Sequence, residues 1–203
     1  MATQPPGDGL ALHLDATAED VFEPGFVSSA PLLRFEAFLA SERLFGWVRL
    51  DADRLTDLLN AHDALHLYRS TFESLEDGST RHEEDLVIPR SSLVAVAVTG
   101  PRGDPVLRRW THSHPAVIQL GEYLMGGYAH TTPGDEPLAT ILARPPMVPL
   151  TDAWLEHWRG GKRHRKWIGT MVFNRDLADW VRVVSEDELE LGLLRPDPAL
   201  PAS

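Results

Sequence analysis

The sequence predicts a mainly β fold made of two tandem small barrels, each with five strands and one short helical turn. Three observations lead to this prediction. Two segments of the chain share one order of apolar runs and turns, which indicates an internal repeat. Apolar and polar residues alternate in stretches such as LHLYRSTFESL and AWLEHW, as in half-buried strands. Asp77-Gly78 and Gly160-Gly161 follow these stretches, and both dipeptides favour hairpin turns.

The repeat aligns segments of the two halves in the same order along the chain. The aligned segments are Gly46-Trp47 with Gly127-Tyr128, Leu55/Leu58/Leu59 with Leu138/Ile141/Leu142, residues 63–78 with 146–161, and residues 86–98 with 171–183. Apolar residues three and four positions apart lie on one side of a helical turn. Each half therefore reads as two strands, a helical turn and three further strands.

This reading divides the chain into five segments. Both ends are rich in Pro, Gly, Ala and acidic residues, as is typical of disordered tails. Ser185 followed by Glu188 has the spacing of a capping box, which predicts a short helix there. The predicted segments are a disordered N-terminal tail (1–29), the first barrel (30–98), a linker rich in Gly, Pro and Arg (99–114), the second barrel (115–184), and an acidic short helix with a tail (185–203).

The last predicted strand of the first half, Leu93 to Val98, is continuously apolar. Such a strand is expected to be covered on both faces or to lie at an interface. Together with Leu86 to Ile88 it is the candidate edge for pairing with another barrel, since an exposed apolar edge promotes aggregation. Trp47, Tyr128 and Trp180 are interpreted as contacts within or between the barrels.

Composition limits the function classes. A formal net charge of -11 argues against a protein that mainly binds nucleic acid, because phosphate neutralisation needs surplus Lys and Arg. The absence of cysteine excludes disulfides, thiolate metal sites and a cysteine nucleophile. The N-terminal sequence has no basic and apolar leader pattern, and no run of eighteen apolar residues occurs. We therefore expect a cytoplasmic protein that does not enter a membrane.

The second half carries two stretches, MVPLTDAWLEHW and KWIGTMVFNRDLADWV, that resemble the two conserved stretches of Sm-like proteins. The positions that carry the resemblance are Leu150, Asp152, Ala153, Ile168, Gly169, Val172, Arg175 and Val181. The resemblance covers most of the second half and, more faintly, a similar span of the first half. It implies five-stranded bent barrels that assemble into rings through edge strands and often bind uridine-rich RNA.

The sequence departs from the Sm-like pattern in three places. The base-contacting Asn of the family would fall near Val148 or Pro149, and neither side chain offers a hydrogen bond. The usual Arg-Gly pair appears as Asn174-Arg175 and as Pro89-Arg90. The helical turn is an insertion. The barrel is therefore expected to be inherited without RNA binding.

The two equivalent hairpins carry opposite charges. Residues 73–85 hold six acidic residues against one Arg, whereas residues 156–167 hold five basic residues against one Glu. We expect these hairpins to dock on one another, within one chain or head to tail between chains. The predicted partner-binding residues are Arg159, Lys162, Arg163, Arg165, Lys166, Glu73, Glu76, Asp77, Glu83, Glu84 and Asp85.

Two other interpretations of the basic hairpin stay open. It can be a solvated loop that binds nothing. It can also bind RNA, with aromatic side chains stacking on bases. The predicted contacts for RNA are Arg159, Lys162, Arg163, Arg165, Lys166, Trp167 and Arg175.

Catalytic and metal-binding patterns are missing from the sequence. It has no nucleophile elbow, phosphate-binding loop or dinucleotide-binding turn. His112 and His114 are weak metal-ligand candidates, because no third ligand follows at a recurrent spacing. We predict a non-enzymatic assembly or protein-binding module without a cofactor, whose partner is a second copy or another protein. An RNA-binding protein is the alternative, and a ligand-sensing barrel pair or a hydrolase comes third.

Overall fold

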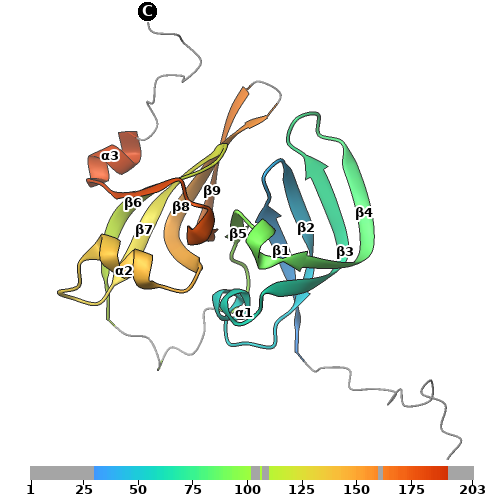
Figure 1. The fold of residues 1–203 in the computed structure, drawn as a ribbon, viewed down its shortest axis with the longest axis horizontal. Coiled ribbons are helices and arrows are strands. Elements are labelled where there is room, and N and C mark those ends of the chain that lie inside the picture. Colours follow the sequence, from blue (N-terminus) through green and yellow to red (C-terminus); the bar gives the residue numbers. More distant parts are fainter. Residues whose placement is uncertain (1–29, 102–105, 107–109, 160–161, 192–203) are drawn as a thin grey trace, which may run out of the picture.

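The computed structural model describes residues 30–101, 106, 110–159 and 162–191. The predicted N-terminal tail, and residues 192–203 of the predicted C-terminal tail, lie outside the described residues. The structure forms two curved units side by side (Figure 1).

The two units contain the same elements in the same order, as the repeat predicts. The first unit consists of β1 (Leu32–Phe38), β2 (Glu42–Arg49), α1 (Leu55–Ala61), β3 (Ala64–Ser74), β4 (Thr80–Pro89), the 3-10 turn η1 (Arg90–Ser92) and β5 (Ala95–Ala97). The second unit consists of β6 (His112–Leu120), β7 (Tyr123–Thr131), α2 (Pro137–Ala143), β8 (Met147–Arg159), β9 (Lys162–Asn174), η3 (Arg175–Leu177) and β10 (Trp180–Val183), and it is followed by α3 (Glu186–Leu191). Strand β6 thus begins inside the stretch predicted as a linker.

All ten strands belong to one antiparallel sheet, in the order β10-β6-β7-β8-β9-β5-β1-β2-β3-β4. Each unit therefore has its fifth strand beside its first and its fourth strand at the far side. The mainly β prediction is confirmed, but two five-stranded barrels are not, because the ten strands form one sheet that is not closed. The short strand β5 is paired with β1 on one side and with β9 of the second unit on the other, so it has no edge left for β4. Strands β4 and β10 form the two ends of the sheet.

The same kink bends the third strand in both units. Arg69 in β3 and Asp152 in β8 have positive φ values, of 49° and 47°, and both lie at irregularities in the strand pairing. A glycine lies opposite each kink. A Cβ on Gly46 would lie 3.0 Å from the Ser70 hydroxyl, and one on Gly127 would lie 2.9 Å from the Thr151 carbonyl oxygen. The alignment of Gly46 with Gly127 is therefore confirmed.

An arginine closes the helix of each unit in the same way. Arg90 donates to the carbonyl oxygens of Asn60 and His62 at the end of α1, at 3.4 and 3.3 Å. Its counterpart Arg175 donates to the carbonyl oxygen of Leu142 at the end of α2, at 2.6 Å. Terminal helix carbonyls have no partner within the helix, so both arginines satisfy groups that the helices leave open.

Each unit has its own apolar core, and the second unit has an additional one on its outer face. The outer core contains Val117, Leu124, Trp154 and Leu189, with Tyr128 and Trp180 packed beside it. Helix α3 supplies Leu189 and lies on the outer side of the second unit (Figure 1). The helix begins with the predicted capping box: the Ser185 amide donates to Glu188 at 3.0 Å, and the Glu188 amide donates to the Ser185 hydroxyl at 3.2 Å.

Trp47 does not occupy the place predicted for it. Its side chain is 43% exposed, although its counterpart Tyr128 packs beneath α3. No helix follows β5 within residues 98–101, so the first unit has no described counterpart of α3 over this face. Within the described residues, no helix has the length and apolar character needed to cross a membrane.

Candidate assembly interface

The joint between the two units is a strand pairing at the centre of the sheet. Ala95, Val96 and Ala97 of β5 lie opposite Phe173, Val172 and Met171 of β9. Further backbone hydrogen bonds of 2.9 Å join residues 98 and 94 to residues 170 and 174. Strand β5 is fully covered, so the prediction that its apolar run pairs with another unit is confirmed.

Side chains from each unit also enter the core of the other unit. Met147 and Val172 of the second unit belong to the core of the first unit. Phe38 and Leu75 of the first unit belong to the core of the second. Tyr123 donates its hydroxyl to the Leu39 carbonyl oxygen at 2.5 Å, and burial raises the pKa of this phenol. The two units therefore share apolar cores across the joint.

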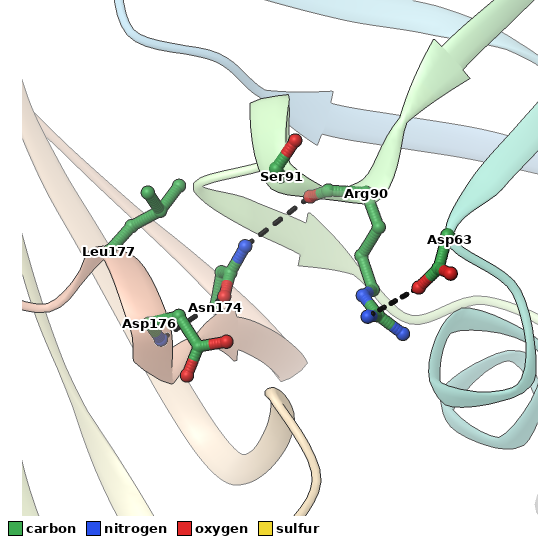
Figure 2. A pocket seen from close by; sticks show the side chains of 6 residues that line it. All are labelled: Asp63, Arg90, Ser91, Asn174, Asp176 and Leu177. Carbon is green, nitrogen blue, oxygen red and sulfur yellow. Dashed lines mark hydrogen bonds and ion pairs between the residues drawn. The ribbon is translucent and has the colours of Figure 1, made fainter.

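Two asparagines connect the backbones of the units. The Asn60 side chain, at the end of α1, donates to the Met147 carbonyl oxygen at 2.9 Å and accepts from the Met147 amide at 3.0 Å. The buried Asn174 side chain donates to the Arg90 carbonyl oxygen at 3.3 Å. Figure 2 shows this second contact beside the pocket that the two units form.

The pocket in Figure 2 has a volume of about 270 Å³ and is lined by both 3-10 turns. Its charged side chains already have partners. Arg90 donates to Asp63 at 2.8 Å, and Asp176 accepts from Arg175 at 2.9 Å. The Asp176 amide also donates to the Asn174 side chain at 3.2 Å. Each of these three contacts lies within one unit and occupies the charged groups of the pocket, so we assign no ligand to it.

Two residues buried in the core of the first unit have exposed repeat counterparts, one on the end strand β4 and one on α2. Val172 is fully buried in the core of the first unit, but its counterpart Val87 on β4 is 68% exposed. Leu59 of α1 is fully buried in that core, but its counterpart Leu142 of α2 is 52% exposed. Both Val172 and Leu59 thus belong to the core of the first unit, and the repeat copy of each residue is exposed.

The open ends lack some features of the joint. Pro89 stands in the place of Asn174 and has no backbone amide to donate. Ala143 stands in the place of Asn60, so the amide contact to a neighbouring backbone is also lost. A contact between these ends would therefore depend on strand pairing and apolar burial, and would be weaker than the joint within the chain.

The predicted basic hairpin is formed by the ends of β8 and β9. Glu156 binds Arg165 at 2.8 Å and also binds Arg163. Lys166 binds Glu36 of β1 at 2.7 Å, which is a contact between the units. Lys162 is exposed, and the Arg159 side chain lies outside the described residues. The hairpin thus reaches the first unit through Glu36, a residue outside the predicted acidic hairpin.

The predicted acidic residues lie at three places. Glu73 is 3.8 Å from Arg43, and Glu76 is exposed at the turn after β3. Asp77 accepts hydrogen bonds from the Ser79 amide and hydroxyl, which lower its pKa to about 2. The remaining three, Glu83, Glu84 and Asp85, are exposed on the edge strand β4.

Of the predicted RNA contacts, Trp167 is accessible, whereas Arg175 is engaged within the fold. Trp167 is exposed on β9. Arg175 donates to the end of α2 and to Asp176, so its guanidinium group is already engaged. The weak metal candidates also differ: His114 is 3.0 Å from the Thr131 hydroxyl, and the ring of exposed His112 lies against Trp110. Among the described residues, no three His, Asp or Glu side chains gather as metal ligands.

Comparison with known proteins gives no relative: no protein-family model, no curated protein and no solved structure matches the chain.

Val87 lies within Leu86 to Ile88, which the sequence selected as part of the candidate pairing edge. Leu142 was aligned with Leu59, but sequence reasoning did not select it as an interface residue, although both stand at repeat positions whose counterparts are apolar. Charge drew attention to the hairpin tips, whereas the joint itself is mainly apolar.

Proposed function

We propose that the protein is a non-enzymatic assembly module that joins copies of itself head to tail. Strand β10 of one copy pairs with β4 of the next and repeats the β5–β9 joint. One observation carries the proposal: Val87 and Leu142 are exposed, while their counterparts Val172 and Leu59 are both buried in the core of the first unit, which Val172 enters across the joint. Apolar side chains left open on an edge strand favour strand addition.

The repeat gives the register of this pairing. Val96 lies opposite Val172 in the joint, so Val181 of one copy would lie opposite Val87 of the next. The β4 edge then gains a partner strand, and Val87 gains an apolar environment. Each exposed valine or leucine that becomes fully buried contributes about 1.5–3 kcal/mol.

The resemblance to Sm-like proteins supports this proposal, because it implies assembly through edge strands. The second candidate, RNA binding, has less support. Arg175 is engaged at the end of α2, and Glu156 and Glu36 neutralise part of the basic hairpin. RNA binding is therefore an outcome that the experiment distinguishes.

The test compares two single variants, Val87→Asp and Leu142→Asp, with the parent protein by sedimentation velocity over a range of concentrations. Each variant blocks one of the two pairing surfaces, the β4 edge or the β10 end with α2, and leaves the other surface intact. We expect each variant alone to be monomeric and an equimolar mixture to stop at a dimer, because one intact joint remains per pair. Val106→Asp is the matched control, since it places the same charge on another exposed valine and should leave the assembly unchanged.

A parent protein that stays monomeric at all concentrations would overturn the proposal, as would a mixture that forms no dimer. The same measurement is repeated with a uridine oligonucleotide. A mass increase that requires the oligonucleotide and is lost in Lys162→Glu would support the RNA-binding alternative instead.

A further inference from the structure

We propose that head-to-tail assembly is restrained by repulsion between two acidic segments, and that ionic strength therefore regulates it. One segment is Glu83, Glu84 and Asp85 on the edge strand β4, and the other is the acidic helix α3 that follows β10. The inference rests on the proposed function and deepens it, because the two segments meet when β10 of one copy pairs with β4 of the next.

The strand register places Asp85 beside the end of β10. In the joint within the chain, the Val98 amide donates to the Thr170 carbonyl oxygen at 2.9 Å. The repeat makes Val183 the counterpart of Val98, and Asp85 the counterpart of Thr170. The same hydrogen bond between copies would therefore join Val183 of one copy to Asp85 of the next.

The chain continues past β10 as it does past β5. The Thr99 hydroxyl donates to the Arg34 carbonyl oxygen at 2.6 Å, and the Val184 amide donates to the Pro115 carbonyl oxygen at 3.0 Å. These two carbonyl groups occupy equivalent places in the strand registers of the two units. Helix α3 begins two residues after Val184, so its first residue lies within about 10 Å of the paired end of β10.

Both segments carry a net negative charge. Strand β4 holds three carboxylates against Arg81, and the stretch from β10 to the end of α3 holds four carboxylates against Arg182. Each arginine already has a carboxylate partner within the chain: Arg81 is 2.6 Å from Glu42, and Arg182 is 3.7 Å from Glu188. All seven acidic residues of the two segments are exposed. Like charges therefore meet at the contact between copies.

The joint within the chain has the opposite electrostatics. Lys166 of β9 binds Glu36 of β1 across it at 2.7 Å. The counterparts at the open ends are Arg81, which binds Glu42, and the uncharged Val117. The four residues that follow β5 are also uncharged, whereas the stretch after β10 leads into α3. Charge thus stabilises the joint within the chain and opposes its repetition between chains.

The salt dependence of assembly tests this difference. Repulsion between exposed charges is long-ranged at about 0.01 M salt, where the Debye length is about 30 Å, and is largely screened at about 0.3 M. Burial of Val87 does not depend on this screening. We expect the association constant of the full chain, measured by sedimentation velocity, to rise about five- to tenfold between about 0.01 M and 0.3 M NaCl.

Two charge reversals show whether the repulsion is local. Glu83→Lys on β4 and Glu186→Lys at the start of α3 each place a cation against the acidic segment of the next copy. Each should raise the association constant about fivefold at about 0.01 M NaCl and reduce its salt dependence. The double variant should gain less than the two single gains combined, because two lysines then face each other.

The matched control is Glu122→Lys, which changes the net charge as much as Glu83→Lys does. Glu122 is exposed and lines a cavity with residues of both units, so it lies at the joint within the chain and away from the end strands. Its association constant should stay within about twofold of the parent, because a remote charge contributes little to a contact.

The outcomes separate this inference from the proposed function. A parent protein that stays monomeric at every salt concentration overturns both. Assembly that weakens or stays unchanged as salt rises leaves the proposed function in place and overturns the inference, and weakening would point to docking of the oppositely charged hairpins. An equal gain in Glu122→Lys and Glu83→Lys also overturns it, because net charge alone would then explain the salt effect.

Discussion

Glu36 is the residue through which charge connects the two units. It accepts from Lys166 of β9 at 2.7 Å and from Arg43 of β2 at 2.6 Å. Burial acts to raise the pKa of this carboxyl group, but the hydrogen bonds from Lys166 and Arg43 outweigh burial and hold the pKa below its ordinary value. The ionised form is therefore the one that the folded chain prefers.

This preference makes the stability of the fold dependent on pH. A carboxyl group with a lowered pKa in the folded state stabilises the fold fully above its ordinary pKa, and this contribution is lost as pH falls through the lowered value. We expect Glu36→Gln to lower the urea midpoint at about pH 7 and to lose less stability than the parent on acidification to about pH 3. Asp135→Asn, in an exposed turn, is the control, and it should lose as much stability on acidification as the parent. Equal losses in Glu36→Gln and the parent would contradict the prediction.

Sequence reasoning identified some individual residues and missed others. The repeat alignment placed Arg69 on Asp152 and Arg90 on Arg175. In the structure, Arg69 and Asp152 both have positive φ at the kink of the third strand, and Arg90 and Arg175 both donate to carbonyl oxygens at the end of a helix. The alignment followed apolar spacing and turn residues, which are local. The exposure of Trp47 depends on which face a distant helix covers, and local spacing does not carry that information.

The bent third strand is the element that gives each unit its curvature. Its kink leaves no room for a side chain on the facing strand. In the second unit, a Cβ on Gly127 would meet backbone and Ala153 atoms at 2.9 to 3.1 Å. In the first unit, the atom nearest to a Cβ on Gly46 is the Ser70 hydroxyl, which can turn away.

We therefore expect Gly127→Ala to lower the free energy of unfolding by about 1–3 kcal/mol, in the range of overpacked cores. Gly46→Ala should cost less, because a hydroxyl rotation relieves part of the clash. Denaturation with urea, followed by circular dichroism, measures both variants. The prediction fails if Gly46→Ala is the more damaging change, or if neither variant differs from the parent.

The strands and helices were predictable from the sequence, but whether the strands close into barrels was not. Ten strands and the helical turns follow from alternation, from Asp77-Gly78 and Gly160-Gly161, and from the leucine spacing. Closure depends on which strand pairs with β5. That strand has three residues and two apolar faces, and local spacing does not show that β9 rather than β4 takes its second edge. The predicted interface at Leu93 to Val98 was correct, and it is the reason why the barrel does not close.

At the scale of the whole molecule, the basic hairpin illustrates how charge is distributed in an acidic chain. Glu156 and Glu36 bind three of its cations, so part of the positive charge is used within the fold. The acidic residues of β4 remain exposed at one end of the sheet, whereas the basic hairpin extends from β8 and β9 in its middle. The net charge therefore describes the surface poorly: the β4 edge is acidic, and the cavity beside Trp47 is lined by Arg49 and Arg69.

Shared cores should make the two units unfold together. Phe38 of the first unit packs in the core of the second, with its ring 5.9 Å from that of Tyr123, while Met147 and Val172 pack in the core of the first. Opening either unit exposes apolar surface of the other. We expect hydrogen exchange of the slowest amides in β3 and in β8 to report one common free energy of opening.

Phe38→Ala tests this coupling. It removes a buried aromatic ring at the joint and should lower the free energy of opening by about 3–5 kcal/mol. Because the cores are shared, the loss should be equal for amides of β3 and of β8, although Phe38 belongs to one core cluster only. The matched control is Phe72→Ala, which removes a ring from the core of the first unit. Phe72→Ala should also lower the free energy of opening equally for the amides of β3 and of β8. If either variant weakens protection in one unit and leaves the other unchanged, the units fold independently, and the joint is a contact between two domains rather than a shared core.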